Sequence, residues 1–233
     1  MLKQVGRCIW VAEQPLKFLG LQVGTRMTVI LRSDNSLLLI SPIKIDNHLK
    51  QQIDSLGTVK YIIAPNLFHH LYLEHCQKLY SQAELIAPLG IEIKQPNVNV
   101  SKTFERDKID FNGELDYLPF KGFQAFIPPK IVTVNEIVFF HPHSQTLILT
   151  DSAFNFDRNF PFTTQLAAII LGCYQSLQPS LLEKIAIKDR EKISKSISLI
   201  LAWDFQQIIM AHGNIVVKNA KEQLKAGYEW FLN

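Results

Sequence analysis

Three apolar stretches of the chain each run into residue types that can bind a metal ion. The stretches are IIAPNLFHH (62–70), LILTDSAFN (147–155) and IIMAHGN (208–214), and the metal-binding residue types in them are His69, His70, Asp151 and His212. Imidazole nitrogens and carboxylate oxygens suit Zn²⁺, Fe²⁺ or Mn²⁺. One histidine after a strand is more often a hydrogen-bonded structural residue, so the interpretation depends on the four together. Ligands of open α/β sheets collect at the carboxyl ends of strands, and the pattern therefore predicts a metal site at such an edge.

The elements that must position these residues alternate in the first half of the chain. The predicted elements are a hairpin over 25–42, a helix over 46–57, a strand over 59–65, a helix over 71–80 and a strand over 83–88. Asp46 is a typical N-cap of the first helix, and Gly57 is a typical stop. Alternation of strand and helix patterns predicts a mainly parallel sheet.

The second half has a different character. Residues 95–130 are rich in Pro, Asn and Gly and predict short strands and turns, and residues 135–151 predict a hairpin that turns at Pro142–Gln145. A helix over 183–201, a strand over 205–213 and a closing helix over 219–232 follow. Because no repeat or low-complexity linker divides the sequence, we expect one α/β domain over residues 1–233.

Composition narrows the classes of protein. Apolar residues make up 47% of the chain, which allows a substantial core, and the formal charge is only +3. The lysines are dispersed and form no basic stripe, so we expect no nucleic-acid partner. Three cysteines without a CxxC spacing make a disulfide framework improbable and favour a reducing compartment. No long apolar segment follows the first basic residues, so we expect no signal peptide and a cytoplasmic protein.

The segment 159–182 carries no charged residue. Its purely apolar centre, Leu166–Leu171, is far shorter than the roughly 20 residues that a membrane-spanning helix needs. We therefore expect a buried helix or a segment that covers the surface, and peripheral contact with a membrane is the less favoured third alternative. The segment follows Asp151 and could lie over a binding site.

Other polar residues near the predicted metal ligands have more than one possible role. Asn66 could direct its carboxamide into the site or complete the turn. Glu74 could orient His70, or it could be an ordinary solvated residue of a helix. His141 and His143 lie in the turn of the predicted hairpin, roughly 20 Å from its other end at about 3.3 Å per residue, and we interpret them as turn residues.

The order of these stretches resembles the metallo-β-lactamase superfamily. The stretches APNLFHHLYL, EIVFFHPHSQTLILTDSAFN and LAWDFQQIIMAHGN are similar to a branch of it with altered metal motifs. The resemblance covers roughly residues 20–233 and implies a four-layer αββα sandwich. Members of the superfamily carry an HxHxDH motif, a later His, an Asp after a hairpin strand and a His near the C-terminus.

Placing HxHxDH on residues 65–70 puts Pro65 and Leu67 at the first two histidines, His69 at the aspartate and His70 at the last histidine. No histidine occurs between residues 76 and 140, so the resemblance implies that the first metal site has lost its ligands. The second site keeps donors, and its implied ligands are His69, His70, Asp151 and His212. The His in place of Asp raises the charge of that site by one, which suits a lone ion. Decay of an unused site would remove donors from both.

Two functions follow from this reading. The first is a metal-dependent hydrolase with one divalent ion, zinc before iron or manganese, that activates water against an ester, thioester or phosphoester of an unknown small molecule. The alternative is a non-catalytic, degenerate member, with or without a metal, that binds a ligand or another protein. A hydrogen-bonded network in a dead site would also account for the retained residues. Whether the protein is an enzyme stays open at this point.

Overall fold

The structure is a computed structural model, and it describes residues 1–127, 129–134 and 136–232. The chain divides into two compact units, and each is described by itself. Unit 1 comprises Met1–Gln14 and Thr25–Glu114, and unit 2 comprises Pro15–Gly24 and Leu115–Asn233. Of the sequence predictions, Pro128 in the region of short strands and Asn135 at the start of the second hairpin lie outside the described residues. The single domain over residues 1–233 stays a prediction.

Unit 1 is built on one sheet with the strand order β1-β2-β5-β6-β7-β8-β9. The strands are β1 Lys3–Gly6, β2 Ile9–Gln14, β5 Thr25–Leu31, β6 Ser36–Ile40, β7 Thr58–Ile63, β8 Glu84–Ala87 and β9 Lys102–Thr103. β5 and β6 form the predicted hairpin, and the steps from β6 to β7 and from β7 to β8 are parallel. The prediction of parallel pairing over residues 37–88 is confirmed, whereas β1, β2, β5 and β6 pair antiparallel.

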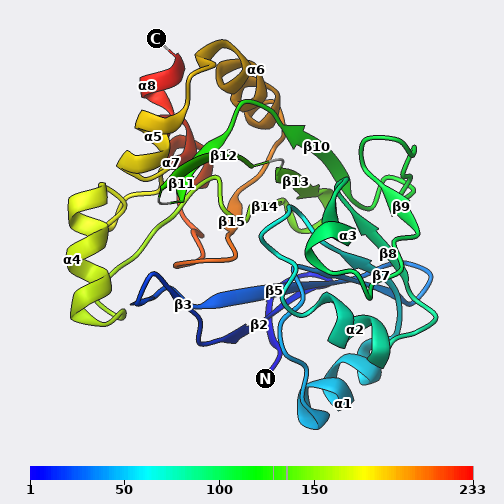
Figure 1. Ribbon diagram of the computed structural model, residues 1–233. Helices are drawn as coiled ribbons and strands as arrows, with labels where there is room; N and C mark the ends of the chain where they lie inside the picture. The colour runs from blue at the N-terminus through cyan, green and yellow to red at the C-terminus, as the bar shows by residue number, and fades with distance from the viewer. Residues whose placement is uncertain (128, 135, 233) are drawn as a thin grey trace. The chain divides into compact units, whose positions relative to one another are not determined.

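The helices of unit 1 are α1 Asn47–Leu56, α2 Leu73–Leu79 and α3 Ile91–Lys94. Asp46 caps α1 as predicted, because its carboxylate accepts the Leu49 N–H at 2.8 Å. α1 and α2 pack against β7 (Figure 1). Both apolar faces meet there: Ile53 of α1 and Cys76 of α2 belong to the same buried cluster as Ile62 of β7.

Unit 2 contains a sheet with the strand order β10-β13-β14-β15 and two separate hairpins. The sheet strands are β10 Asp116–Phe120, β13 Glu136–His141, β14 Thr146–Ile148 and β15 Gln207–Ile209. The hairpins are β3 Lys17–Phe18 with β4 Leu21–Gln22, and β11 Gln124–Ile127 with β12 Lys130–Thr133. β13 and β14 turn through a short 3₁₀ helix, Pro142–Ser144, which confirms the predicted hairpin.

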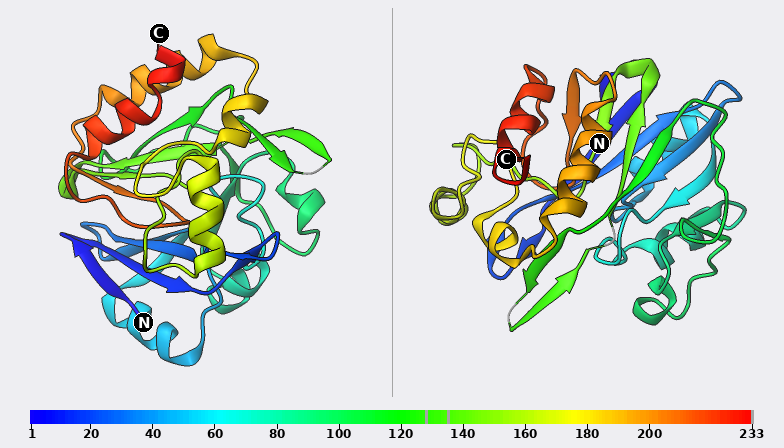
Figure 2. Two further views of the ribbon diagram at one scale, coloured as in Figure 1. Left: turned by 90° about the vertical axis from the view of Figure 1, so that its left-hand side faces the viewer. Right: turned by 90° about the horizontal axis from the view of Figure 1, so that it is seen from above.

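The helices of unit 2 are α4 Phe162–Leu171, α5 Leu181–Ala186, α6 Arg190–Leu201, α7 Ala220–Gly227 and α8 Glu229–Leu232. The single helices predicted over 183–201 and 219–232 are wrong, since each is two helices. Ile187 is extended, and Asp189 starts α6 by accepting the Lys192 N–H at 3.0 Å. At the second break, Tyr228 leaves helical geometry and buries its ring completely. Figure 2 shows α6 beside α7 and α8.

The uncharged segment contains α4, which is only partly buried. Thr164 and Ala168 face the unit, and the exposed apolar side chains are Phe162, Leu166, Ile169 and Ile170. The expectation of a fully buried helix is therefore wrong, and the surface-covering alternative fits better. No helix in the described part of the chain is long and apolar enough to span a bilayer.

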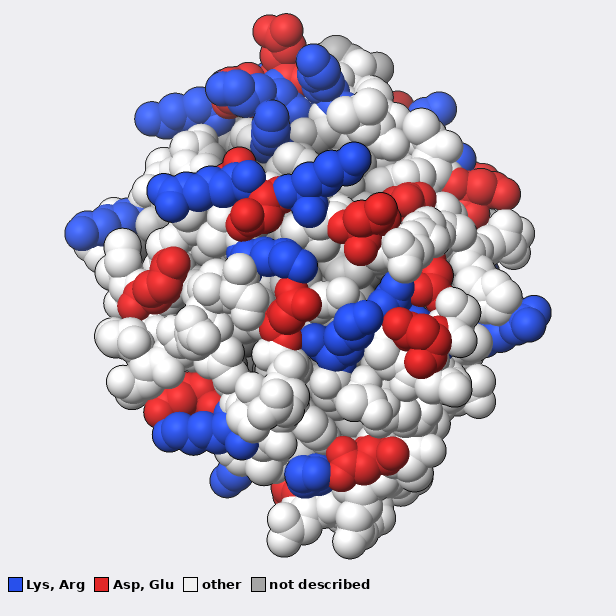
Figure 3. Space-filling model, turned by 90° about the vertical axis from the view of Figure 1, so that its right-hand side faces the viewer, with Lys and Arg blue, Asp and Glu red and all other residues white. Residues whose placement is uncertain are grey.

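The structure shows where the charged surface residues and the three cysteines lie. On the face drawn in Figure 3, basic and acidic side chains lie interspersed and gather into no patch of one sign. Cys8, Cys76 and Cys173 form no disulfide, and the last two are buried. Burial raises the pKa of both buried thiols to about 12, so they act as small packed apolar groups.

Candidate metal centre

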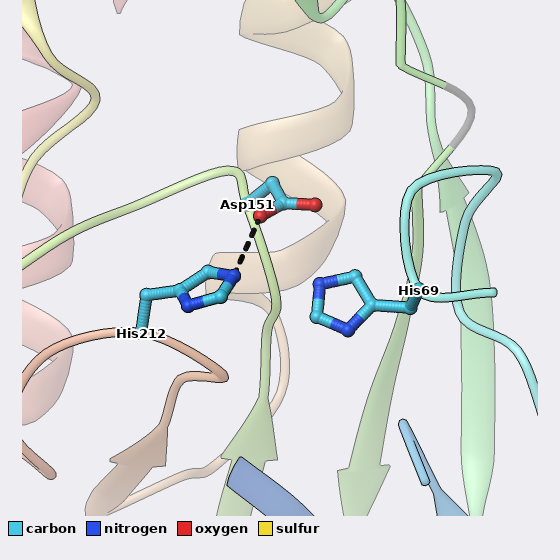
Figure 4. A group of neighbouring side chains, drawn as sticks. All are labelled: His69, Asp151 and His212. Atoms are coloured by element: carbon cyan, nitrogen blue, oxygen red, sulfur yellow. Dashed lines mark ion pairs between the residues drawn. The ribbon is translucent and has the colours of Figure 1, made fainter. Parts of the chain in front are cut away.

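Asp151 and His212 follow two neighbouring parallel strands of unit 2. β14 and β15 pair with Ile148 opposite Ile209, and the Leu149 N–H donates to the Ile209 carbonyl at 2.8 Å. Both strands then end at the same edge, where Nε2 of His212 lies 3.4 Å from Oδ1 of Asp151 (Figure 4). Asp151 and His212 thus follow strand ends as the sequence predicted, and the structure adds that the two strands are neighbours.

The tautomer of His212 follows from its second contact. Nδ1 lies 2.6 Å from the Gly24 carbonyl oxygen, which can only accept a hydrogen bond. Nδ1 therefore carries the proton, and in a neutral ring Nε2 carries the lone pair. The ring thus directs a lone pair at a carboxylate oxygen, an arrangement that a cation or a proton between the two atoms stabilises. Metal-binding histidines commonly donate their other ring N–H to a backbone carbonyl in this way.

Gly24 is held by the hairpin formed by β3 and β4. Its N–H donates to the Leu16 carbonyl at 3.1 Å, and the Val23 N–H donates to the same oxygen at 2.9 Å. The hairpin thereby fixes the carbonyl group that orients the His212 ring. No role for Gly24 was predicted from the sequence, and an isolated glycine gives no signal for one.

The loop that carries His212 closes tightly. Ile208 and Val216 form an antiparallel bridge across it, with N–H to O distances of 2.8 and 3.0 Å. Gly213 has φ +84°, and a Cβ there would lie 2.5 Å from the Asn155 carbonyl oxygen. That carbonyl accepts the Asn214 N–H at 2.7 Å. Only glycine combines this backbone angle with so close an approach.

A buried carboxylate supports the loop that carries Asp151. Glu136, at the start of β13, is 0% exposed and accepts the N–H groups of Thr150 and Asp151, each at 2.8 Å. It also accepts the Ser152 hydroxyl at 2.8 Å. Burial, followed by the nearby charge of Asp151, raises the pKa of Glu136 to about 7. Glu136 was not among the residues predicted from the sequence, although an acid opening the apolar run IVFF was a visible signal.

His69 lies in unit 1, in the turn after β7, and is labelled in Figure 4. Its Nδ1 is 2.5 Å from the hydroxyl of Ser41, a buried residue directly after β6. Asn66 is completely buried and accepts the N–H groups of Phe68 at 2.8 Å and His69 at 3.2 Å. Of the two roles considered for Asn66, the carboxamide oxygen thus completes the turn. Ser41, like Gly24 and Glu136, was not predicted from the sequence.

His70 follows in the same turn and has a different partner. The Gln95 amide donates to His70 Nδ1 at 3.1 Å. Partial burial, with the neighbouring charges of Lys94 and His69, lowers the pKa of His70 and favours its neutral ring. Glu74 pairs with Lys78 at 2.6 Å, as an ordinary solvated helix residue does. As a metal ligand, His70 stays a prediction.

The histidines of the β13–β14 turn serve the turn itself. His141 Nδ1 lies 2.7 Å from the Ser144 hydroxyl, and the ring of His143 contacts that of His141 edge-on at 6.2 Å between centroids. The interpretation as a turn residue is confirmed for His143, whereas His141 is the last residue of β13 and pairs with Thr146.

The donor chemistry fits a divalent metal ion. His69, Asp151 and His212 each offer one ligand atom, an imidazole nitrogen or a carboxylate oxygen. This combination suits zinc and the other first-row divalent metals. In unit 2 the His212 lone pair and the Asp151 oxygen already face each other across 3.4 Å, about the separation of two atoms bound to one zinc ion at roughly 2 Å each.

Solved structures with the same fold are metallo-β-lactamases and flavodiiron cores. A metallo-β-lactamase from Pontibacter korlensis has a TM-score of 0.65 and 11% identity, with 98% of each chain covered. One from Hirschia baltica has a TM-score of 0.65 and 14% identity, covering 99% of this chain and 97% of that one. The Flv1 flavodiiron core from Synechocystis sp. PCC6803 has a TM-score of 0.64 and 16% identity, covering 100% of this chain and 60% of that one. At these identities the likeness shows the fold alone, and it confirms the predicted metallo-β-lactamase-like α/β fold.

Two sequence comparisons complete this assignment. A search of curated proteins found no match. A family model described as "Domain of unknown function (DUF4336)" matches residues 7–176, well over half of the chain. This chain therefore belongs to the DUF4336 family.

Proposed function

We propose that the protein binds one divalent metal ion and uses it to hydrolyse an ester, thioester or phosphoester of a small molecule. The proposed ligands are His69, Asp151 and His212, with His70 as the fourth. Zinc is the favoured ion, and iron and manganese are the alternatives.

One observation carries the proposal: the opposed His212 lone pair and Asp151 carboxylate at 3.4 Å. The Gly24 carbonyl fixes the tautomer, so the ring is already set to bind a cation through Nε2. Without a cation or proton between them, these two acceptor atoms would repel each other. Salt-bridge formation by a protonated His212 is the competing explanation, and metal content separates the two.

His69 belongs to unit 1, so the proposal requires both units to contribute to one ion. Its support is the order of donors along the chain, which follows the metallo-β-lactamase pattern, and the Ser41 contact that orients the ring through Nδ1. The fold neighbours also support a metal, since their names are those of metallo-β-lactamases and of a flavodiiron core.

A divalent ion at these residues would supply Lewis acidity for hydrolysis. The chain's own residues provide orientation. The Gly24 carbonyl holds the His212 ring, the Ser41 hydroxyl holds the His69 ring, and strand pairing of β14 with β15 sets the spacing of Asp151 and His212.

The test is elemental analysis of the purified full chain, before and after reconstitution with zinc, iron and manganese. The variants His69→Ala, His70→Ala, Asp151→Asn and His212→Ala are measured singly. Matched controls are His48→Ala on α1 and His143→Ala in the β13–β14 turn. We expect about one ion per chain in the wild type and the controls, and loss of the ion in the ligand variants. A wild type that binds no metal after reconstitution would refute the proposal.

Activity is tested on the reconstituted protein with chromogenic carboxylic esters, thioesters and phosphoesters. Hydrolysis that disappears in His212→Ala but persists in His143→Ala supports the enzyme. Bound metal without turnover of any of these substrate classes favours the second candidate, a non-catalytic protein that binds a small molecule or another protein. The four exposed apolar side chains of α4 are the observation that favours this candidate.

A further inference from the structure

We infer that Glu136 is a positioning residue: its buried carboxylate fixes the backbone of Thr150–Ser152 and so holds the Asp151 side chain toward His212. This inference rests on the proposed function, because it gives Glu136 its purpose at the same site. Glu136 itself is not proposed to bind the metal.

The geometry comes from a three-point contact. Oε1 of Glu136 accepts the Thr150 N–H and the Ser152 hydroxyl, and Oε2 accepts the Asp151 N–H, all at 2.8 Å. These three donors belong to consecutive residues that begin two positions after the end of β14. The last hydrogen bond from this segment to the neighbouring strand is the one from Leu149 to Ile209. For the next three residues, the Glu136 carboxylate is the hydrogen-bond acceptor.

The burial of Glu136 argues that this contact has a purpose. A fully buried acid is costly unless its oxygens are satisfied, and it is costlier with another carboxylate nearby. An apolar residue at the start of β13 would continue the run IVFF without that cost. The hydrogen bonds that compensate the burial all go to the loop of Asp151, so the acid and the loop geometry depend on each other.

The same loop is supported from its other side. The hydroxyl of Tyr228, a completely buried residue, donates to the Ser152 carbonyl. Glu136 thus binds backbone N–H groups of the loop Thr150–Ser152, and Tyr228 binds a backbone carbonyl of the same loop. Asp151 lies between the two residues whose backbone groups are tied, which leaves its backbone little freedom to rotate.

The test compares the full-length wild type with Glu136→Gln. Glutamine has nearly the same shape, but its NH₂ group must face either the Asp151 N–H or the donors of Thr150 and Ser152. The matched control is Glu114→Gln, the same change at an acid of unit 1 that also accepts a backbone N–H, that of Ser33 at 2.6 Å. Zinc affinity is measured by competition with a chromophoric chelator. Backbone amide exchange of Asp151 is measured by NMR on the metal-free protein, and cooperative unfolding checks the fold of each variant.

We expect Glu136→Gln to bind zinc about ten- to a hundredfold more weakly and to lose protection of the Asp151 amide, while Glu114→Gln changes neither. Wild-type zinc affinity together with a protected Asp151 amide in Glu136→Gln would overturn the inference. A wild type that binds no zinc while Glu136→Gln still loses amide protection would refute the proposed function and keep the role of Glu136 in holding the loop.

Ser152→Ala is the second test variant, and it replaces Glu136→Gln if that protein does not fold. It removes one of the three donors and leaves both backbone contacts of the carboxylate. Its zinc affinity should fall by a smaller factor than that expected for Glu136→Gln, with faster exchange of the Asp151 amide. Unchanged affinity and unchanged exchange in this variant would overturn the inference as well.

Discussion

The ring of His212 donates from Nδ1 to the Gly24 carbonyl at 2.6 Å and, through Nε2, faces Oδ1 of Asp151 at 3.4 Å. A hairpin near the start of the chain therefore orients a histidine near its end. Because the Gly24 carbonyl can only accept a hydrogen bond, Nδ1 of His212 carries the proton and Nε2 remains to bind a cation. The chemistry of the site thus depends on a backbone atom as much as on the side chains.

Metal binding should stabilise the protein against heat. An ion that binds the folded state raises the free energy of unfolding by about 2.7 kcal/mol when its concentration is a hundred times Kd. We expect zinc to raise the melting temperature of the wild type, and a chelator to reverse the shift. Differential scanning calorimetry of Asp151→Asn and His212→Ala should show no such shift, whereas His143→Ala should respond like the wild type. An equal shift in all four proteins would mean that zinc binds elsewhere.

Replacing Gly213 should loosen the His212 loop. Alanine at Gly213 would strain a backbone with φ +84° by about 1–2 kcal/mol and place its Cβ 2.5 Å from the Asn155 carbonyl oxygen. Gly20→Ala is the matched control, because Gly20 has φ +82° and nothing within 4 Å of the added Cβ. Urea unfolding should show a larger loss of stability for Gly213→Ala than for Gly20→Ala. Equal losses would show that backbone strain alone accounts for the effect.

Removing the Asn66 carboxamide should destabilise the turn that carries His69. Two backbone N–H groups lose their acceptor in Asn66→Ala, and leaving buried donors unsatisfied costs about 1–3 kcal/mol. The matched control is Asn97→Ala, because Asn97 is exposed and reaches Glu74 only at 3.4 Å. We expect the urea midpoint to fall clearly in Asn66→Ala and little in Asn97→Ala. Similar midpoints in the two variants would contradict the role of the turn.

Strand ends were predictable from the sequence because apolar runs and their polar termini are local patterns. The placement of Asp151 and His212 just past apolar strands followed from those runs, whereas the pairing of β14 with β15 is seen only in the structure. The contacts of Gly24 with His212 and of Ser41 with His69 were not predictable, because each joins separate segments of the chain. His212 and Gly24, for example, are 188 residues apart. The contacts of Glu136 lie within the predicted hairpin, but the sequence does not show that its carboxylate accepts from Thr150–Ser152.

The interruptions of two helices were also not predicted from the sequence. The residues over 183–201 have helical periodicity throughout, and the break at Ile187 is a tertiary effect that propensity does not record. For Tyr228, burial of a large ring among Phe120 and Phe231 outweighs the continuity of the closing helix. Periodicity thus predicted where these helices lie but not where they are interrupted.

The stability of the protein in acid should depend on Asp34. Its carboxylate accepts the Ser36 hydroxyl at 2.5 Å and the Ser36 N–H at 3.0 Å, and Arg32 and Lys60 lie at 3.2 and 3.5 Å. The Ser36 hydroxyl, followed by the Ser36 N–H and the two cations, lowers the pKa of Asp34 from 3.8 to about 2. A carboxyl whose pKa is lower in the folded state stabilises the protein above its unfolded pKa. This contribution is therefore present above about pH 3.8 and is lost as the pH falls toward 2.

Asp34→Asn should remove this part of the pH dependence, and Ser36→Ala, which removes the largest cause of the lowered pKa, should shift it to higher pH. The measurement is the free energy of unfolding by urea at closely spaced values between pH 5 and pH 2. Both variants keep Arg32 paired with Glu114 at 2.8 Å, so the rest of the cluster stays in place. If the slope of stability against pH below 3.8 is the same in the wild type and in Asp34→Asn, other carboxyl groups account for acid unfolding and the assignment to Asp34 is wrong.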